Sequence, residues 1–193
     1  MKGMIQMPVS NIGKKKTLAK KRVSFSLPKR QTYAVMQSEF DKFGATLIQL
    51  AHGVWAAAID GQIRSKFLLK NSKNWVNDPK ASSLVGRYDF RSWTVVSAED
   101  LNADVDYYVM AVSQRQPEKL DMIVLTKSEL QKLYDDPRRK VGKRGEKFFY
   151  FSRLLNGRLG DSRFSKSTSE DYAGWIDIDK SKLNNYKLLV EQK

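Results

Sequence analysis

The chemistry that this chain can do is carried mainly by lysines and arginines gathered in two segments. Residues 1–31 hold nine basic residues and no acidic one, and residues 138–166 hold ten basic residues against two acidic ones. The remainder is close to neutral, although the whole chain has a net charge of +14. Concentrated positive charge gains free energy by releasing counterions from a polyanion. The charge pattern therefore predicts a protein that binds the phosphates of nucleic acid.

The two basic segments have different predicted characters. Residues 1–30 have few large apolar groups and are predicted to form a flexible basic arm that orders on binding. The second segment contains Gly142 and Gly145, which would let backbone amides approach a phosphate. The alternative interpretation is a solvated tail and a solvated loop. The predicted phosphate contacts are Lys14, Lys15, Lys16, Lys20, Lys21, Arg22, Lys66, Lys70, Lys73, Arg138, Arg139, Lys140, Lys143, Arg144 and Lys147.

Trp75 is the best candidate for contact with a base, because it lies in a polar stretch between Lys73 and Asn77. Stacking of a base on an exposed ring contributes about 1–3 kcal/mol. Most aromatic residues in a domain of this size belong to the core, which is the alternative for every other ring. The aromatic stretch 148–151 follows the second basic segment, so one of its faces could be core while the other meets a ligand.

The composition argues against several other classes of function. The chain has no cysteine and a single histidine, His52, which excludes zinc-thiolate sites, cysteine nucleophiles and multi-histidine metal sites. The segment 138–145 lacks the Gly-Lys-Ser/Thr ending of a phosphate-binding Walker loop. The arm has no apolar residues at helical spacing that would attach it to a membrane. We therefore expect a cytoplasmic or nucleoid-associated protein in a reducing compartment.

The first elements of the chain predict a helix followed by a meander. Residues 31–43 carry apolar side chains at helical spacing and are followed by Gly44, a common C-terminal stop. Asp60-Gly61 is a strong signal for a two-residue hairpin. The three predicted strands are residues 45–51, 54–59 and 62–70.

The later elements predict more strands and a capped helix. Residues 71–87 are predicted to be a loop or a short irregular helix, and Ser97 with Asp100 could open a helical turn. Thr126 and Glu129 form a capping box at the start of a second helix. Further predicted strands are residues 92–96, 105–112 and 121–125, with a last strand within residues 171–193. The order predicts a mixed α/β fold with a single central mixed sheet flanked by helices, in one domain of residues 31–193.

Several of these features also occur together in a known superfamily. They are Lys70, residues 93–96, residues 104–112, and residues 122–125 followed by the cap at 126–129. In these features the chain resembles the PD-(D/E)XK nuclease superfamily. The resemblance implies a restriction-endonuclease-like fold, with a helix, a meander, a crossover and a further strand and helix. It also implies a divalent metal that activates water for phosphodiester cleavage.

The catalytic motif of that superfamily is incomplete in this chain. The resemblance implies an acid at the start of the second strand, and an acid or glutamine two residues before the motif lysine. If Lys70 is that lysine, Leu68 stands in the acid position, and residues 54–59 do not begin with an aspartate. If Lys66 is the lysine, Arg64 stands in the acid position. Neither register assembles the two oxygen ligands that magnesium needs.

The leading hypothesis is a nucleic-acid-binding protein that uses its arm and its basic loop, without a cofactor and without nuclease activity. One alternative is a magnesium-dependent endonuclease with Lys70, Lys66, Asp60 and Glu39 as its candidate residues. Asp60 is also explained as a turn residue and Glu39 as a solvated helix residue. Another alternative is a structural nucleoprotein, for example of a phage particle. The expected partner is DNA or RNA and not a membrane, and self-association is left open.

Overall fold

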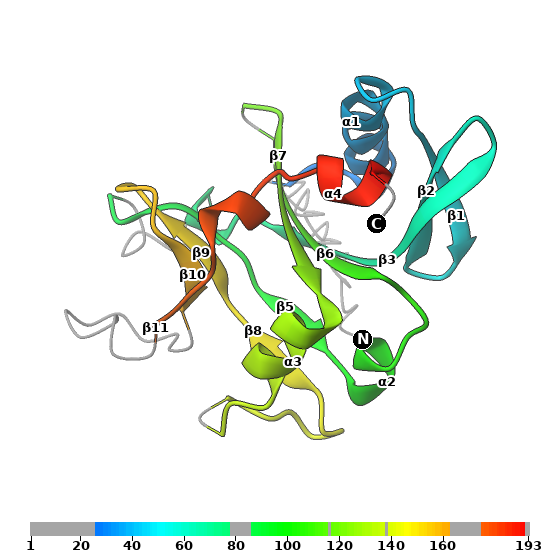
Figure 1. Ribbon diagram of the computed structural model, residues 1–193. Helices are drawn as coiled ribbons and strands as arrows, with labels where there is room; N and C mark the ends of the chain where they lie inside the picture. The colour runs from blue at the N-terminus through cyan, green and yellow to red at the C-terminus, as the bar shows by residue number, and fades with distance from the viewer. Residues whose placement is uncertain (1–25, 78–85, 116, 138, 163–174, 192–193) are drawn as a thin grey trace, which may run out of the picture.

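The centre of the fold is a mixed sheet of five strands in the order β1-β2-β3-β6-β7 (Figure 1). The computed structural model describes residues 26–77, 86–115, 117–137, 139–162 and 175–191. β3 and β6 pair in parallel, and the other neighbours pair antiparallel. The central mixed sheet expected from the sequence is therefore confirmed. Its strands are β1 (Thr46–Ala51), β2 (Val54–Ile59), β3 (Gln62–Lys73), β6 (Tyr107–Gln114) and β7 (Lys119–Thr126).

The meander that opens the sheet follows the predicted turns closely. Asp60 and Gly61 have φ values of 51° and 74°, the left-handed conformations that this two-residue hairpin requires. β3 runs to Lys73, three residues beyond the predicted end at residue 70. The extension is stabilised by β6, because residues 71–73 pair with residues 111–113 of the parallel neighbour.

One face of the central sheet is covered by α1 (Lys29–Asp41) and α4 (Lys187–Val190), which Figure 1 shows close together. Met36 and Phe40 of α1 pack against Phe67 of β3 in a single apolar cluster. The helix begins two residues before the predicted start at residue 31. It also ends before Phe43, which is 41% exposed instead of lying on the apolar face as predicted.

The opposite face carries α2 (Ala98–Leu101) and α3 (Lys127–Tyr134). Both helices begin with a capping box: the one at Thr126 is predicted as such from the sequence, and the one at Ser97 is predicted only as a possible start of a helical turn. The hydroxyl groups of Ser97 and Thr126 accept bonds from the backbone amides of Asp100 and Glu129. The two acidic side chains accept bonds from the Ser97 and Thr126 amides in return, so the start of each helix is fixed locally.

Two smaller sheets complete this face, and they correct the prediction of a single sheet. A four-stranded antiparallel sheet has the order β11-β10-β9-β4, and β5 pairs with β8. Part of the predicted 71–87 loop forms the short helix η1 (Trp75–Asn77). The additional strands are β4 (Tyr88–Arg91), β5 (Thr94–Val96), β8 (Lys147–Phe149), β9 (Phe151–Leu154), β10 (Leu159–Ser162) and β11 (Trp175–Asp177). The last of these confirms the strand expected near Trp175.

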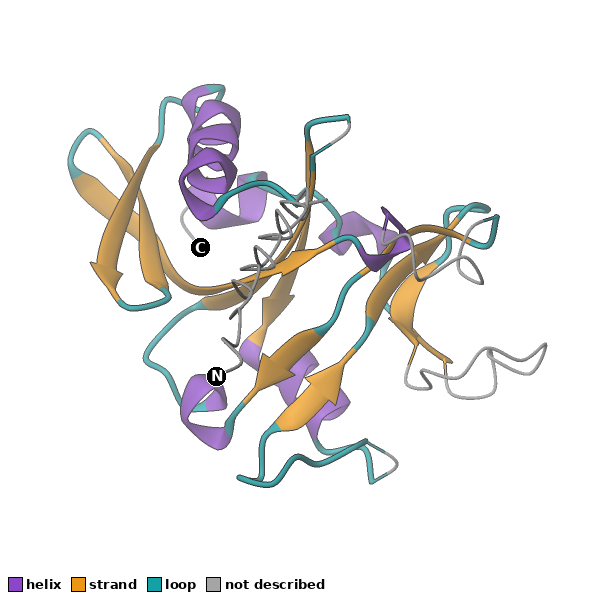
Figure 2. Cartoon of the chain, turned by 180° about the vertical axis from the view of Figure 1, so that it is seen from behind, coloured by secondary structure: helices purple, strands orange, loops and turns teal. Residues whose placement is uncertain are grey.

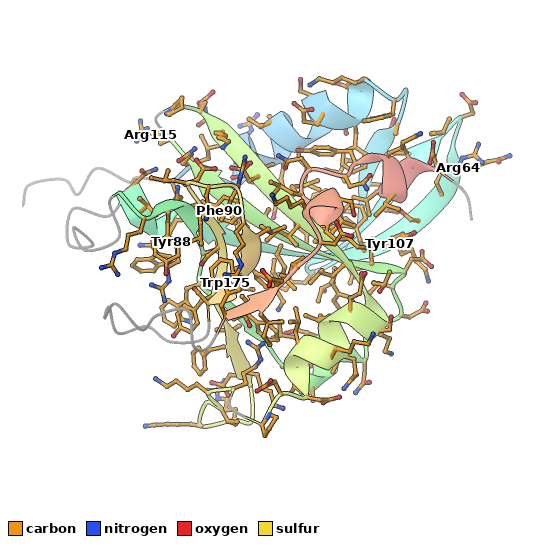
Figure 3. The ribbon with its side chains drawn as sticks, turned by 60° about the vertical axis from the view of Figure 1, so that its left-hand side comes forward. Arg64, Tyr88, Phe90, Tyr107, Arg115 and Trp175 are labelled. Atoms are coloured by element: carbon orange, nitrogen blue, oxygen red, sulfur yellow. The ribbon has the colours of Figure 1, made fainter. Side chains whose placement is uncertain are left out.

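The four-stranded sheet has its own small apolar cluster of Tyr88, Leu154 and Trp175, with Tyr88 and Trp175 labelled in Figure 3. Phe90 of the same sheet instead joins the larger cluster against the central sheet. The short turn η4 (Lys180–Lys182) then leads the chain back across the molecule to α4. The smaller sheets are thus anchored to the central sheet by a shared core.

Candidate nucleic-acid interface

The four candidate catalytic residues lie in three separate places. Lys66 and Lys70 point to the face of the sheet that carries α2. Phe67 and Leu69, which alternate with them along β3, face α1. Glu39 lies on α1, on the opposite face, and pairs with Lys42 at 2.6 Å. Asp60 is exposed in the hairpin between β2 and β3. The predicted catalytic set is therefore not brought together, and its grouping is corrected.

Each of the two candidate lysines is bound to an aspartate that the sequence analysis did not select. The Lys70 ammonium lies 2.6 Å from Asp100 Oδ1, and the Lys66 ammonium bonds to Asp104. Burial opposes the ionisation of Asp100, but the bonds from Lys70 and Ser97 outweigh it and hold its pKa below the usual value. The bond to Asp104 raises the pKa of Lys66. Both lysines are neutralised locally, so a phosphate would have to displace a carboxylate to reach either.

The surroundings of Lys70 do not fit the magnesium ion that the nuclease resemblance implies. The Asp100 carboxylate already holds Lys70 with one oxygen and the Ser97 amide with the other. β2 supplies no acidic residue beside it. In the described ranges, no three His, Asp or Glu side chains form a group suited to a metal ion.

Arg139 belongs to the core and is corrected as a phosphate contact. Its side chain is 1% exposed and forms a buried ion pair with Asp161 of β10. The guanidinium also donates to the carbonyl groups of Leu133 and Phe148, both at 2.7 Å. These bonds tie the end of α3, β8 and β10 together. The residue has a structural role in this fold.

The basic loop, defined as residues 139–147, is folded around Glu146. The Gly142 amide donates to the Glu146 carbonyl at 2.7 Å, and the Gly145 amide donates to the Gly142 carbonyl at 3.2 Å. The Arg144 amide donates to the Glu146 carboxylate at 2.8 Å. The backbone amides expected to approach a phosphate are therefore used inside the loop. Its glycines serve the loop's own geometry.

The cations of the basic loop differ in how far they are available. Lys147 donates to the Tyr134 carbonyl at 2.7 Å, at the C-terminal end of α3 where a positive charge is favourable. Lys140, Lys143 and Arg144 are exposed, and within the described part of the chain none of them forms an ion pair. These three side chains are the cations of the loop that can meet a phosphate.

A row of aromatic rings lies beside this loop on the β5–β8 pair. Trp93, just before β5, and Val95 within it are 45% and 36% exposed, whereas Thr94 and Val96 are buried. The Trp93 and Phe148 rings are near-parallel, with centroids 6.0 Å apart. The centroid of the Trp75 ring lies 5.9 Å from that of Trp93, with the two rings tilted. We call Trp75, Trp93 and Phe148 the aromatic row.

Cations lie at both ends of the aromatic row. The Lys73 ammonium lies 4.0 Å from the centre of the Trp75 ring, and the Lys140 ammonium lies 5.5 Å from the centre of the Phe148 ring. Trp75 and Trp93 also line a pocket of about 360 Å³, together with Lys29 of α1. The surface runs from this pocket, across the rings, to the basic loop.

The structure therefore brings together only part of the predicted binding set. It unites Lys73, Trp75, Lys140, Lys143 and Arg144 on this surface. It adds the exposed Trp93. The sequence does not reveal this residue, because alternation in Ser92-Trp93-Thr94 would place the apolar ring in the core, whereas Ser92 and Thr94 are the buried residues. The predicted contacts that lie outside the described residues are Lys14, Lys15, Lys16, Lys20, Lys21, Arg22 and Arg138.

Comparison of the chain with descriptions of protein families, with curated proteins and with solved structures found no match. None of the helices in the described ranges is long and apolar enough to cross a membrane.

Proposed function

We propose that this protein binds nucleic acid through the aromatic row and the exposed cations around it, and that it does not cleave its ligand. The observation that carries the proposal is a set of neighbouring rings with Lys73 over Trp75 and Lys140 over Phe148. Lys143 and Arg144 are exposed in the same loop as Lys140. Cations contact phosphates and rings contact bases, so this combination suits nucleic acid better than a protein or a small anion.

The order of the elements and the ion pairs of Lys66 and Lys70 support a protein that binds nucleic acid without cleaving it. A helix, a meander, a crossover, β6, β7 and α3 follow one another in the order expected of a restriction-endonuclease-like scaffold. Lys66 and Lys70 are the two candidates for the motif lysine. Lys66 forms an ion pair with Asp104, and Lys70 forms one with Asp100. A scaffold that retains the lysines without the metal-binding acids is suited to binding rather than cleavage.

The salt dependence of binding tests this function. Neutralising two phosphate contacts by the double substitution Lys143→Gln and Arg144→Gln should flatten the slope of log K against log salt by about 1.4 to 1.8. The matched control is Lys42→Gln with Lys187→Gln, which changes the net charge equally on the opposite face of the sheet. The slope should stay near that of the wild type in this control. Equal slopes for both double variants, or binding that ignores salt, would contradict the proposal.

Cleavage is tested separately with supercoiled plasmid and RNA in magnesium and in manganese. We expect both substrates to remain intact. Cleavage that disappears in the Lys70→Ala variant would assign the protein to the metal-dependent nucleases instead.

A further inference from the structure

We infer that the ligand is single-stranded nucleic acid, with unpaired bases stacked on the aromatic row. This inference rests on the proposed function and names the class of nucleic acid that the same surface takes. It depends on three features of the row: its exposure, its rigidity and its flanking cations.

The outward position of Trp93 (45% exposed) and of the half-buried Phe148 follows from the alternation of side chains in and next to the β5–β8 pair. Val96 and Phe149 point inward, where the Phe149 ring packs near-parallel to Tyr134 of α3 at 6.4 Å. Val95 and its cross-strand partner Phe148 therefore point to the other side. Figure 2, seen from behind relative to Figure 1, shows the two strands in front of α3. The rings are carried on the side of the pair that the core does not use.

The rings are also held in place before any ligand arrives. The Trp93 amide donates to the Ser72 hydroxyl at 3.0 Å, and that hydroxyl donates to the Trp93 carbonyl at 3.0 Å. The buried Asn74 side chain accepts bonds from the amides of Val76 and Arg91, both at 3.1 Å, and so fixes the segment that carries Trp75. A ligand would therefore lose little free energy in ordering this surface.

The flanking cations suit a backbone that runs beside stacked bases. The Lys73 ammonium lies over the Trp75 ring and the Lys140 ammonium over the Phe148 ring, so positive charge stands next to two of the three rings. Lys29 adds a further positive charge at the pocket next to Trp75 and Trp93. Such an arrangement of rings within a basic groove is how single strands are bound without base-specific readout.

A duplex cannot use the same surface in the same way. Its base faces are covered by the neighbouring base pairs, so only its phosphates and groove edges remain for contact. A duplex would thus engage the cations and leave the rings without a partner. Single strands should bind more tightly than the duplex of equal length.

The test compares labelled oligo(dT) and oligo(U) with a dA–dT duplex of the same length, using fluorescence anisotropy. Trp93→Ala should weaken binding of single strands by roughly 5- to 150-fold, the equivalent of 1–3 kcal/mol for one stacked base. Trp93→Phe should restore most of the loss. The salt slope should be unchanged in both variants, because stacking releases no counterions. Comparable losses with the two oligonucleotides would show that stacking does not depend on the sugar.

A control variant, a second ring variant and unfolding measurements separate a lost contact from a damaged fold. Leu155 is 64% exposed on a different surface, so Leu155→Ala should leave affinity unchanged. Phe148→Ala removes a second ring of the row and should also weaken the binding of single strands. The thermal unfolding of each variant is measured alongside.

The outcomes distinguish the inference from the function on which it rests. If Trp93→Ala and Phe148→Ala bind oligo(dT) as the wild type does, while the Lys143 and Arg144 double variant is impaired, stacking is overturned and phosphate binding stands. A duplex that binds as tightly as the single strands also overturns the inference. If no nucleic acid binds at all, both proposals fail.

Discussion

Asp161 gives one arginine of the basic loop a role unlike that of its neighbours. Arg139 turns inward to this carboxylate, whereas Lys140 and Arg144 stay at the surface. A buried arginine in an ion pair stabilises the fold only while its partner and its other hydrogen bonds are kept. Charge alone does not separate these roles, because the partner lies 22 residues away in the sequence.

Arg139→Met should lower the free energy of unfolding by about 3–5 kcal/mol, because it breaks the buried ion pair with Asp161. Arg144→Met in the same loop should change stability by no more than about 0.5 kcal/mol, because that side chain is exposed. Urea denaturation of both variants measures the difference. Similar stabilities for the two variants would show that the buried pair does not support the fold.

At the scale of elements, the predictable parts are those whose signals lie within a few residues of one another. The Asp60-Gly61 turn, the helical turn opened by Ser97 and the capping box at Thr126 are of this kind, and all three are confirmed. The missed strands β4, β9 and β10 have four residues each, and they depend on partners far along the chain. Four residues of mixed polarity carry too little periodicity for a strand to be recognised alone.

The proposed binding surface is only partly predictable from the sequence for the same reason. Trp75 and Lys73 were selected because they are neighbours in a polar stretch. Trp93 joins them through the Ser72 hydroxyl on β3, a contact between residues 21 positions apart. Lys66 and Lys70 were selected by motif, but aspartates of the β5–β6 crossover neutralise them. Such pairings are set by the tertiary fold.

Gly160 shows how closely the smaller strands pack, and it provides a prediction for β10. A Cβ atom at this position would lie 2.4 Å from the Ile176 carbonyl oxygen and 2.5 Å from the Trp175 ring. Gly160→Ala should therefore push β11 away and cost about 1–3 kcal/mol of stability. Chemical denaturation measures the cost, and the near-ultraviolet circular dichroism reports the displaced Trp175. An unchanged midpoint with an unchanged spectrum would contradict this packing.

At the scale of the whole molecule, the fold begins before the predicted domain boundary at residue 31. Leu27 is 4% exposed, and the Pro28 carbonyl accepts a bond from the Thr32 amide at 2.9 Å. Residues 27–30 are thus part of the packed structure. Seven basic residues stand at positions 1–25, outside the described residues.

Two truncations separate these contributions. Deleting residues 1–25 should leave the unfolding midpoint unchanged and flatten the salt dependence of nucleic-acid binding, because phosphate contacts are lost. Deleting residues 1–30 should in addition lower the midpoint, because Leu27 and the Pro28 carbonyl are removed from α1. Thermal unfolding and salt titrations of both proteins measure the two effects. Equal midpoints would place the true boundary beyond residue 30.

The alternation along β5 has a consequence for how this protein can change over time. Thr94 and Val96 face the interior, whereas Trp93 and Val95 face outward. Substitutions on the outer side can therefore accumulate without endangering the fold, since exposed positions tolerate most replacements. Under the proposed function, replacing Trp93 or Val95 would change which ligand is bound while the fold stays the same. For a designer, the same two strands offer a small and separable set of positions to randomise.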